Sequence, residues 1–198
     1  MTSDIPEYIK SRIKQSIPLN DIIPYSTPVI SFGNPALARV ATLGINPSNL
    51  EFQCPKTKLE LPEHKRRLQT LTSLGVRALD RADDEIIRLI LKDCNNYFQK
   101  NPYWWFCQLE EYILRQIDVS YWNGSACHLD LVQWATKEKW GNLTKTIQAE
   151  LLRRNINLKK KQLCHNLNLE VLLLTGAEVL NNFQNNFVNP LEKREEIK

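Results

Sequence analysis

A short aliphatic run that ends in a glycine and a polar turn constrains the fold of this chain most. Residues 39–48 read RVATLGINPS, so a stretch suited to a buried strand stops at Gly44 and continues as a turn. Two more short runs have the same character, SACHLDLVQWA at residues 125–135 and LEVLLLTG at residues 169–176. Aliphatic runs of this length, separated by segments with helical patterning, predict an α/β domain with a parallel sheet.

The segments between these runs are expected to be mostly helical. Acidic residues at the start of residues 82–98, followed by apolar residues at helical spacing, predict a capped amphipathic helix. Pro102 suits the start of a helix over residues 101–117. An additional strand is expected at residues 27–33, before an Asn-Pro turn. The remaining helices are expected at residues 4–14, 64–75, 146–156, 159–167 and 177–187.

Length and composition indicate one globular domain. The chain has 198 residues, 42% of them hydrophobic and 24% charged, which is typical of a folded domain with a sizeable core. We expect a single α/β domain over residues 1–198, with a helical arm at residues 1–25 and a polar tail at residues 188–198. The net charge of +4 permits a polyanionic partner without requiring one.

Cysteine and histidine usage gives no pattern for a metal or redox site. The five cysteines are dispersed without a CxxC pair, which is typical of reduced thiols in a cytoplasmic protein, and the three histidines are equally dispersed. No apolar run reaches the ~18–20 residues that span a bilayer, and the first residues lack the form of a secretory signal. We therefore expect a cytoplasmic monomer with no metal, no other cofactor and no membrane partner.

Polar residues follow the carboxyl ends of the expected strands, where ligands of open parallel sheets bind. This rule places the Asn46 turn, the residues after Leu129, and Gly176 on one rim. His128 and Asp130 alternate, so they share one face of their strand and could form an acid–base pair. A core histidine satisfied by a neighbour is the alternative, just as GINPS alone also fits a plain Asx-Pro turn.

Three segments, in order along the chain, resemble the uracil-DNA glycosylase superfamily. GINPS at residues 44–48 is similar to the first motif of that family, GINPG or GLNPG, with Ser48 in place of the last glycine. HLDLVQW at residues 128–134 and VLLLTGAEVL at residues 171–180 are similar to its next two strands. The resemblance implies a three-layer fold, with a short parallel sheet flanked by helices. It also implies hydrolysis of the N-glycosidic bond of a base extruded from single-stranded or mismatched duplex DNA.

The resemblance also implies roles for the residues of the first motif. Asn46 would position the water that attacks the anomeric carbon while charge develops on the sugar. Pro47 would stiffen the loop, and Gly44 would let the backbone approach the ligand. The backbone amides of Ile45 and Asn46 would hydrogen-bond the base. Further substrate-binding residues are expected to be Ser48 and His128.

Base stacking and phosphate binding require aromatic and basic side chains near the motif. Phe52 is the nearest aromatic residue and would stack on the base, a role that Tyr103 or Trp104 could equally take. A basic strip over residues 137–161 is expected to be a solvated helix face rather than a phosphate site. The expected phosphate contacts are Lys65, Arg66 and Arg67.

The chain departs from the family pattern in two places. Asp130 stands where many members carry an asparagine that reads the pyrimidine edge, and a carboxylate offers only acceptors, which would repel O4 of uracil. Asp130 could therefore be protonated by burial, accept from another base, or play no part in recognition. The second family motif has no counterpart after Gly176, so we expect the last strand to be missing and the chain to be shortened.

Three functions remain open on the sequence. The first is a glycosylase-like hydrolase with Asn46 and Asp130 as catalytic residues. The second is an inactive or truncated relative that binds nucleic acid or a nucleotide. The third is a different α/β enzyme whose pocket takes a nucleotide or nucleoside, because fold does not imply function.

Overall fold

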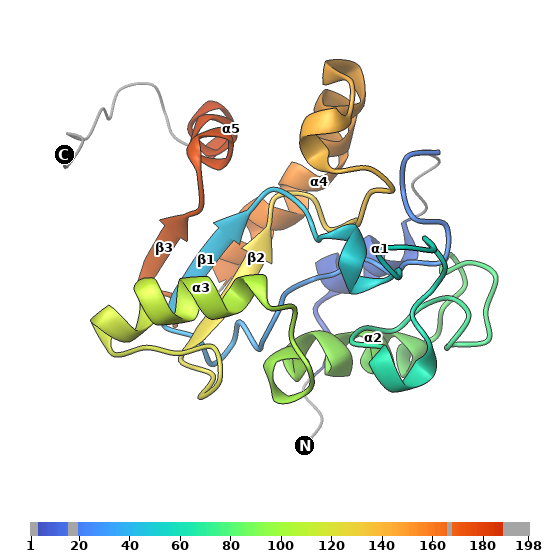
Figure 1. Ribbon diagram of the computed structural model, residues 1–198, viewed down its shortest axis with the longest axis horizontal. Helices are drawn as coiled ribbons and strands as arrows, with labels where there is room; N and C mark the ends of the chain where they lie inside the picture. The colour runs from blue at the N-terminus through green and yellow to red at the C-terminus, as the bar shows by residue number, and fades with distance from the viewer. Residues whose placement is uncertain (1–3, 16–19, 166–167, 188–198) are drawn as a thin grey trace.

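The computed structural model describes residues 4–15, 20–165 and 168–187, which form a three-stranded parallel sheet with helices on both faces (Figure 1). The strand order β2-β1-β3 places β1 in the centre. The strands are β1 (Val40–Gly44), β2 (Ala126–Asp130) and β3 (Val171–Leu174). The helices are α1 (Glu7–Lys14), α2 (Asp84–Asn95), α3 (Trp105–Tyr112), α4 (Lys145–His165) and α5 (Ala177–Phe187). The predicted α/β class with a parallel sheet is confirmed.

Alternation along the strands sends side chains to two apolar layers. Leu43 and Leu129 pack in a cluster with Ile156 of α4 and Val179 of α5. The opposite face packs in a larger cluster that contains residues of α1, α2 and α3. Both faces of β1 and β2 are therefore covered, as continuous apolar strands of a parallel sheet require.

Helix α2 forms where the local sequence predicts it. The Asp83 side chain accepts a hydrogen bond of 2.9 Å from the backbone N–H of Ile86, which caps the helix. Ile87 and Ile90 are buried at helical spacing. The end of the predicted segment is a separate 3-10 turn, Tyr97–Gln99.

The helix expected over residues 64–75 is wrong. A 3-10 turn, Glu63–Lys65, is followed by irregular turns. The side chains of Thr70 and Ser73 each accept a hydrogen bond from the other's backbone N–H, at 3.0 and 2.9 Å. Such local side-chain bonds compete with helical hydrogen bonds, so this segment folds as a turn while Leu68 is buried in the core.

The strand expected over residues 27–33 is also wrong. Phe32 and His128 exchange two backbone hydrogen bonds of 2.8 Å in one isolated antiparallel bridge. The pairing does not extend into a regular strand, because the Ile30 carbonyl accepts from Gln162 Nε2 at 3.2 Å and Val29 N–H donates to the Gln133 carbonyl at 2.7 Å.

Two predicted helix boundaries differ from the structure. The helices expected over residues 146–156 and 159–167 are one continuous helix, α4, because Asn157 and Leu158 between them do not break it. The helix expected over residues 101–117 divides into α3 and the 3-10 helix Leu114–Ile117.

The N-terminal segment expected to be a helical arm contains α1, whose Ile9 and Ile13 pack in the main core. The expectations for the tail at residues 188–198 and for residues 166–167 lie outside the described residues.

Within the described part of the chain, β3 is an edge strand and no strand follows it. No helix in the described ranges is both long and apolar enough to cross a membrane.

Candidate functional site

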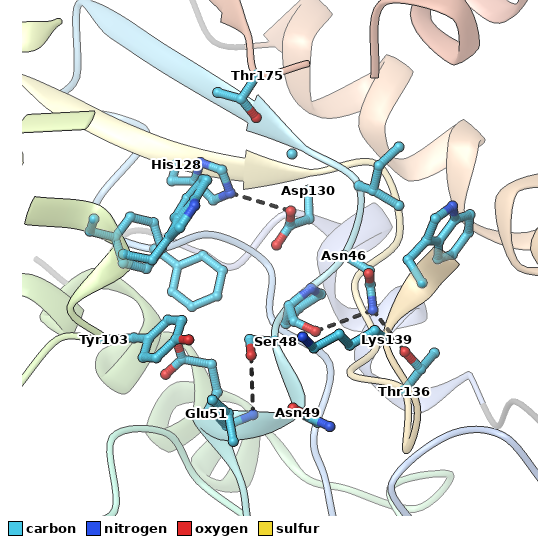
Figure 2. Close-up of a pocket in the computed structure, with 18 of the residues that line it drawn as sticks. Asn46, Ser48, Asn49, Glu51, Tyr103, His128, Asp130, Thr136, Lys139 and Thr175 are labelled. Atoms are coloured by element: carbon cyan, nitrogen blue, oxygen red, sulfur yellow. Dashed lines mark hydrogen bonds and ion pairs between the residues drawn. The ribbon is translucent and has the colours of Figure 1, made fainter. Parts of the chain in front are cut away.

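A cavity of about 410 Å³ opens at the carboxyl ends of the strands (Figure 2). It lies where the rule for open parallel sheets predicts a ligand site. Thr175, directly after β3, also lines it. The residues singled out from the sequence that line this cavity are Gly44, Ile45, Asn46, Pro47, Ser48, His128 and Asp130.

The last residue of β1, Gly44, has no room for a side chain, because two polar side chains occupy the space beside it. Gly44 is paired in register with Asp130 on β2. A Cβ atom at Gly44 would lie 2.5 Å from Asp130 Oδ1 and 2.9 Å from His128 Nε2. The glycine at the end of this aliphatic run therefore makes room for the imidazole and the carboxylate.

His128 lies in a chain of buried hydrogen bonds that ends at Asp130. The Tyr121 hydroxyl is 2.5 Å from Thr42 Oγ1, which is 2.7 Å from His128 Nδ1. His128 Nε2 is 3.3 Å from Asp130 Oδ1. A neutral imidazole that carries its proton on Nε2 satisfies the whole chain, with Tyr121 donating to Thr42, Thr42 to His128 and His128 to Asp130. His128 is thus a buried core histidine, as one interpretation holds, and it also contacts Asp130, the carboxylate named in the other.

Two carboxylate oxygens in the cavity wall have no hydrogen-bond partner. They are Oδ2 of Asp130 and Oε2 of Glu51, and both are buried. The other Glu51 oxygen, Oε1, accepts a hydrogen bond of 2.7 Å from the Tyr97 hydroxyl. Arg67 Nε lies 3.9 Å from Glu51 Oε2, which is an ion pair without a hydrogen bond. Each carboxylate therefore has one oxygen committed to the protein and one open.

Sequence reasoning missed Glu51. Its burial raises the pKa of its carboxyl to about 7, against the opposing effects of Arg67 and the Tyr97 hydrogen bond, and the charge of Asp130 adds to the increase. Glu51 lies in the 3-10 turn Asn49–Glu51. Ser48 caps this turn by accepting a hydrogen bond of 3.2 Å from Leu50 N–H. The sequence alone did not show that this turn carries a buried carboxyl to the cavity.

The amide group of Asn46 has a determined orientation. Its Nδ2 is 3.1 Å from Thr136 Oγ1, 3.2 Å from the Pro47 carbonyl oxygen and 3.5 Å from the Trp134 carbonyl oxygen. The Thr136 hydroxyl donates its own proton to the Glu138 carbonyl at 2.7 Å, so toward Asn46 it can only accept. Three acceptors require the nitrogen at this position, and Oδ1 is left without a partner among the described residues.

The aromatic wall of the cavity differs in part from the one predicted. Phe52 is 1% exposed, belongs to the main core and does not line the cavity, so it cannot stack on a ligand there. Tyr103, one of the two alternatives to Phe52, does line the cavity, together with Trp105 and Phe106, whereas Trp104 does not. Trp105 and Phe106 also pack on the His128 ring, with centroid distances of 5.6 and 5.2 Å.

The predicted phosphate contacts do not line the cavity either. Lys65 is exposed, whereas Arg67 is half-buried and donates to the carbonyl oxygens of Asn101 and Leu50 at 2.7 and 2.9 Å. Arg67 therefore secures the loop that carries Glu51. The exposed Lys139 lines the cavity instead, as do Ser48 and Asn49, and all three are labelled in Figure 2.

Comparisons with known proteins identify no relative: no family model, no curated protein and no solved structure matches the chain. Within the described residues, no group of three or more histidine, cysteine or acidic side chains could hold a metal ion. The groups that the cavity offers for chemistry include the Asn46 amide, the carboxyls of Glu51 and Asp130, and the aromatic rings.

Proposed function

We propose that this protein hydrolyses the N-glycosidic bond of a DNA base that is extruded into the cavity. The pose of Asn46 is the observation that carries the proposal, because its Nδ2 is engaged by three oxygen atoms and its Oδ1 is open to a water molecule. An amide oxygen is too weak a base to deprotonate water, but it can orient water toward C1′. The resemblance of GINPS to the first motif of uracil-DNA glycosylases favours the same role.

In the proposed reaction, the water oxygen bonds to C1′ while the C1′–N bond breaks and its electron pair leaves with the base. The proton lost by the water passes to solvent or to the departing base. A base in the cavity would contact the rings of Tyr103 and Trp105, which line it, and its polar edge would face Asp130. Extrusion is needed because the anomeric bond is not accessible inside a duplex.

A single-turnover incision assay tests the proposal. Single-stranded and mismatched duplex oligonucleotides would carry uracil, hypoxanthine, xanthine or ethenocytosine, and abasic products would be revealed by alkaline cleavage. We expect cleavage by the wild type and a rate about 100-fold lower for Asn46→Ala, since a misplaced nucleophile costs about that factor.

Thr136→Val is the matched positioning variant. It removes one acceptor that holds the Asn46 amide but leaves Asn46 in place. We expect a rate between those of the wild type and Asn46→Ala. The melting temperature should fall by about 2–4 °C, because the buried Thr136 hydroxyl also donates to the Glu138 carbonyl. Absence of cleavage of every base by the folded wild type, or equal rates for wild type and Asn46→Ala, would contradict the proposed hydrolysis.

Binding without turnover is a second candidate, which one observation favours. None of the three basic residues expected to contact phosphate lines the cavity, where Lys139 is the basic residue present. A nucleotide- or nucleoside-binding protein needs fewer phosphate contacts than one that grips a DNA strand. In that case a nucleoside would raise the melting temperature, whereas duplex DNA would not.

A further inference from the structure

The buried polar atoms that the cavity leaves open are all of one kind. Among the described residues, the cavity-lining side chains with a buried, unpartnered nitrogen or oxygen atom are Asp130 and Glu51, and in both the atom is a carboxylate oxygen. Buried polar groups in folded proteins nearly always have partners, so an open one in a cavity wall marks a place for a ligand atom. Oδ2 of an ionised Asp130 suits a hydrogen-bond donor of the ligand, and Oε2 of Glu51 suits one when that carboxyl is ionised.

With His128 protonated on Nε2, Oδ1 of Asp130 is the acceptor of their hydrogen bond. His128 Nε2 faces Asp130 Oδ1 at 3.3 Å, and the Thr42 hydroxyl satisfies the other ring nitrogen at 2.7 Å. With the imidazole donating to Oδ1, the Asp130 carboxylate presents Oδ2 and a remaining lone pair of Oδ1. Figure 2 shows this carboxylate pointing into the space between Tyr103 and Asn46.

We propose that the cavity selects a guanine-type base, one that presents a ring N–H beside an exocyclic amino group, and that Asp130 accepts hydrogen bonds from this edge. The proposal rests on the proposed function, since it requires a base in this cavity. Adjacent N1–H and N2–H donors match the two oxygens of a carboxylate, a pairing that is charge-assisted and bidentate. When its carboxyl is ionised, Glu51 offers Oε2 as a second acceptor to a donor-rich base.

The same geometry disfavours uracil. The pairing edge of uracil presents one N–H between two carbonyl oxygens, and those oxygens would face carboxylates rather than donors. Hypoxanthine shares the N1–H of guanine but lacks the amino group, so it would use only one of the two acceptors. Deoxyguanosine and deoxyinosine therefore form a matched pair that differs in one donor group.

Nucleoside binding tests the proposal separately from catalysis. Trp105 lines the cavity, so tryptophan fluorescence of the wild-type protein, supported by calorimetry, would follow titration with deoxyguanosine, deoxyinosine and deoxyuridine. We expect deoxyguanosine to bind about tenfold more tightly than the other two, the discrimination typical of a good bidentate contact. In Asp130→Asn, which keeps the side-chain shape but replaces one acceptor with a donor, this preference should disappear.

Equal binding of the three nucleosides by the wild type, tighter binding of deoxyuridine or deoxyinosine, or binding of none would overturn the proposal. These results need no variant, so they stand even if Asp130→Asn does not fold. The incision assay, extended to 8-oxoguanine, which keeps the same donor edge, separates the two proposals. Deoxyguanosine preference without incision of any base supports recognition of the guanine edge by Asp130 and contradicts hydrolysis. Incision of uracil without deoxyguanosine preference supports hydrolysis and contradicts recognition of the guanine edge by Asp130.

Discussion

Two buried polar clusters lie near β2, and they differ in how completely the protein satisfies them. The first is the cavity wall, where Asp130 and Glu51 each keep one open oxygen. The second, which we term the helix-side cluster, lies where α1 and α4 pack together. Its members are Arg12, Gln133, Asn155, Lys159 and Gln162.

In the helix-side cluster, most polar side-chain atoms have a hydrogen-bond partner within the protein. Asn155 Oδ1 accepts from the Arg12 guanidinium and from Gln133 N–H, and its Nδ2 donates to the Leu151 carbonyl at 2.6 Å. Lys159 Nζ donates to Gln162 Oε1 at 2.7 Å. Only Arg12 Nε and Gln133 Oε1 lack partners, and neither residue lines the cavity. The helix-side cluster therefore stabilises the fold, whereas the cavity has two buried carboxyl oxygens that a ligand could bind.

The largest effect is expected for Asn155→Ala. The change removes one of the two acceptors of the buried Arg12 guanidinium, which keeps only Gln15 Oε1, and it leaves the Gln133 N–H without its acceptor. We expect a loss of about 3 kcal/mol in the free energy of unfolding. Urea denaturation at pH 7 measures it. Asn157→Ala, on the exposed side of the same helix, is the control and should change stability by about 0.5 kcal/mol or less. Equal effects of the two variants would remove the distinction between the clusters.

A pH-dependent effect is expected for Glu51→Gln. The pKa of Glu51 is raised from 4.5 to about 7, so folding favours the protonated form. The stabilisation is present below pH 4.5 and is lost as pH rises toward 7, which amounts to about 3 kcal/mol for a shift of this size. We expect wild-type stability to fall between pH 5 and pH 8, and Glu51→Gln to show a much weaker fall. The control is Glu63→Gln, at an exposed position, which should keep the wild-type pH dependence.

The smallest effect on stability is expected for Asp130→Asn. Its Oδ2 has no partner to lose and its single hydrogen bond, to His128, is long, so we expect a change of about 1 kcal/mol or less in the urea experiment. A loss as large as that of Asn155→Ala would show that Asp130 is a structural residue. A small change in the free energy of unfolding, together with loss of nucleoside discrimination, would show that Asp130 serves ligand binding. The helix-side cluster, by contrast, would serve stability.

The sequence predicted those elements whose signals are local. Helix α2 carries its own cap at Asp83 and its own apolar spacing, and the three aliphatic runs became the three strands. The segment at residues 64–75 has helical spacing as well. It folds as turns because the side chains of Thr70 and Ser73 bond to the backbone, a competition that spacing does not reveal.

What the sequence determined by itself about the site is its location, because parallel strands bring their carboxyl ends to one edge and the glycine and polar residues at those ends mark it. Only the tertiary structure decided which side chains face the cavity. Glu51 is buried there beside Tyr97, which lies 46 positions away, and Asn46 is oriented by Thr136, 90 positions away. Phe52, next to Glu51 in the chain, turns into the core instead. Burial and orientation depend on contacts between distant segments, and these contacts exist only once the chain has folded.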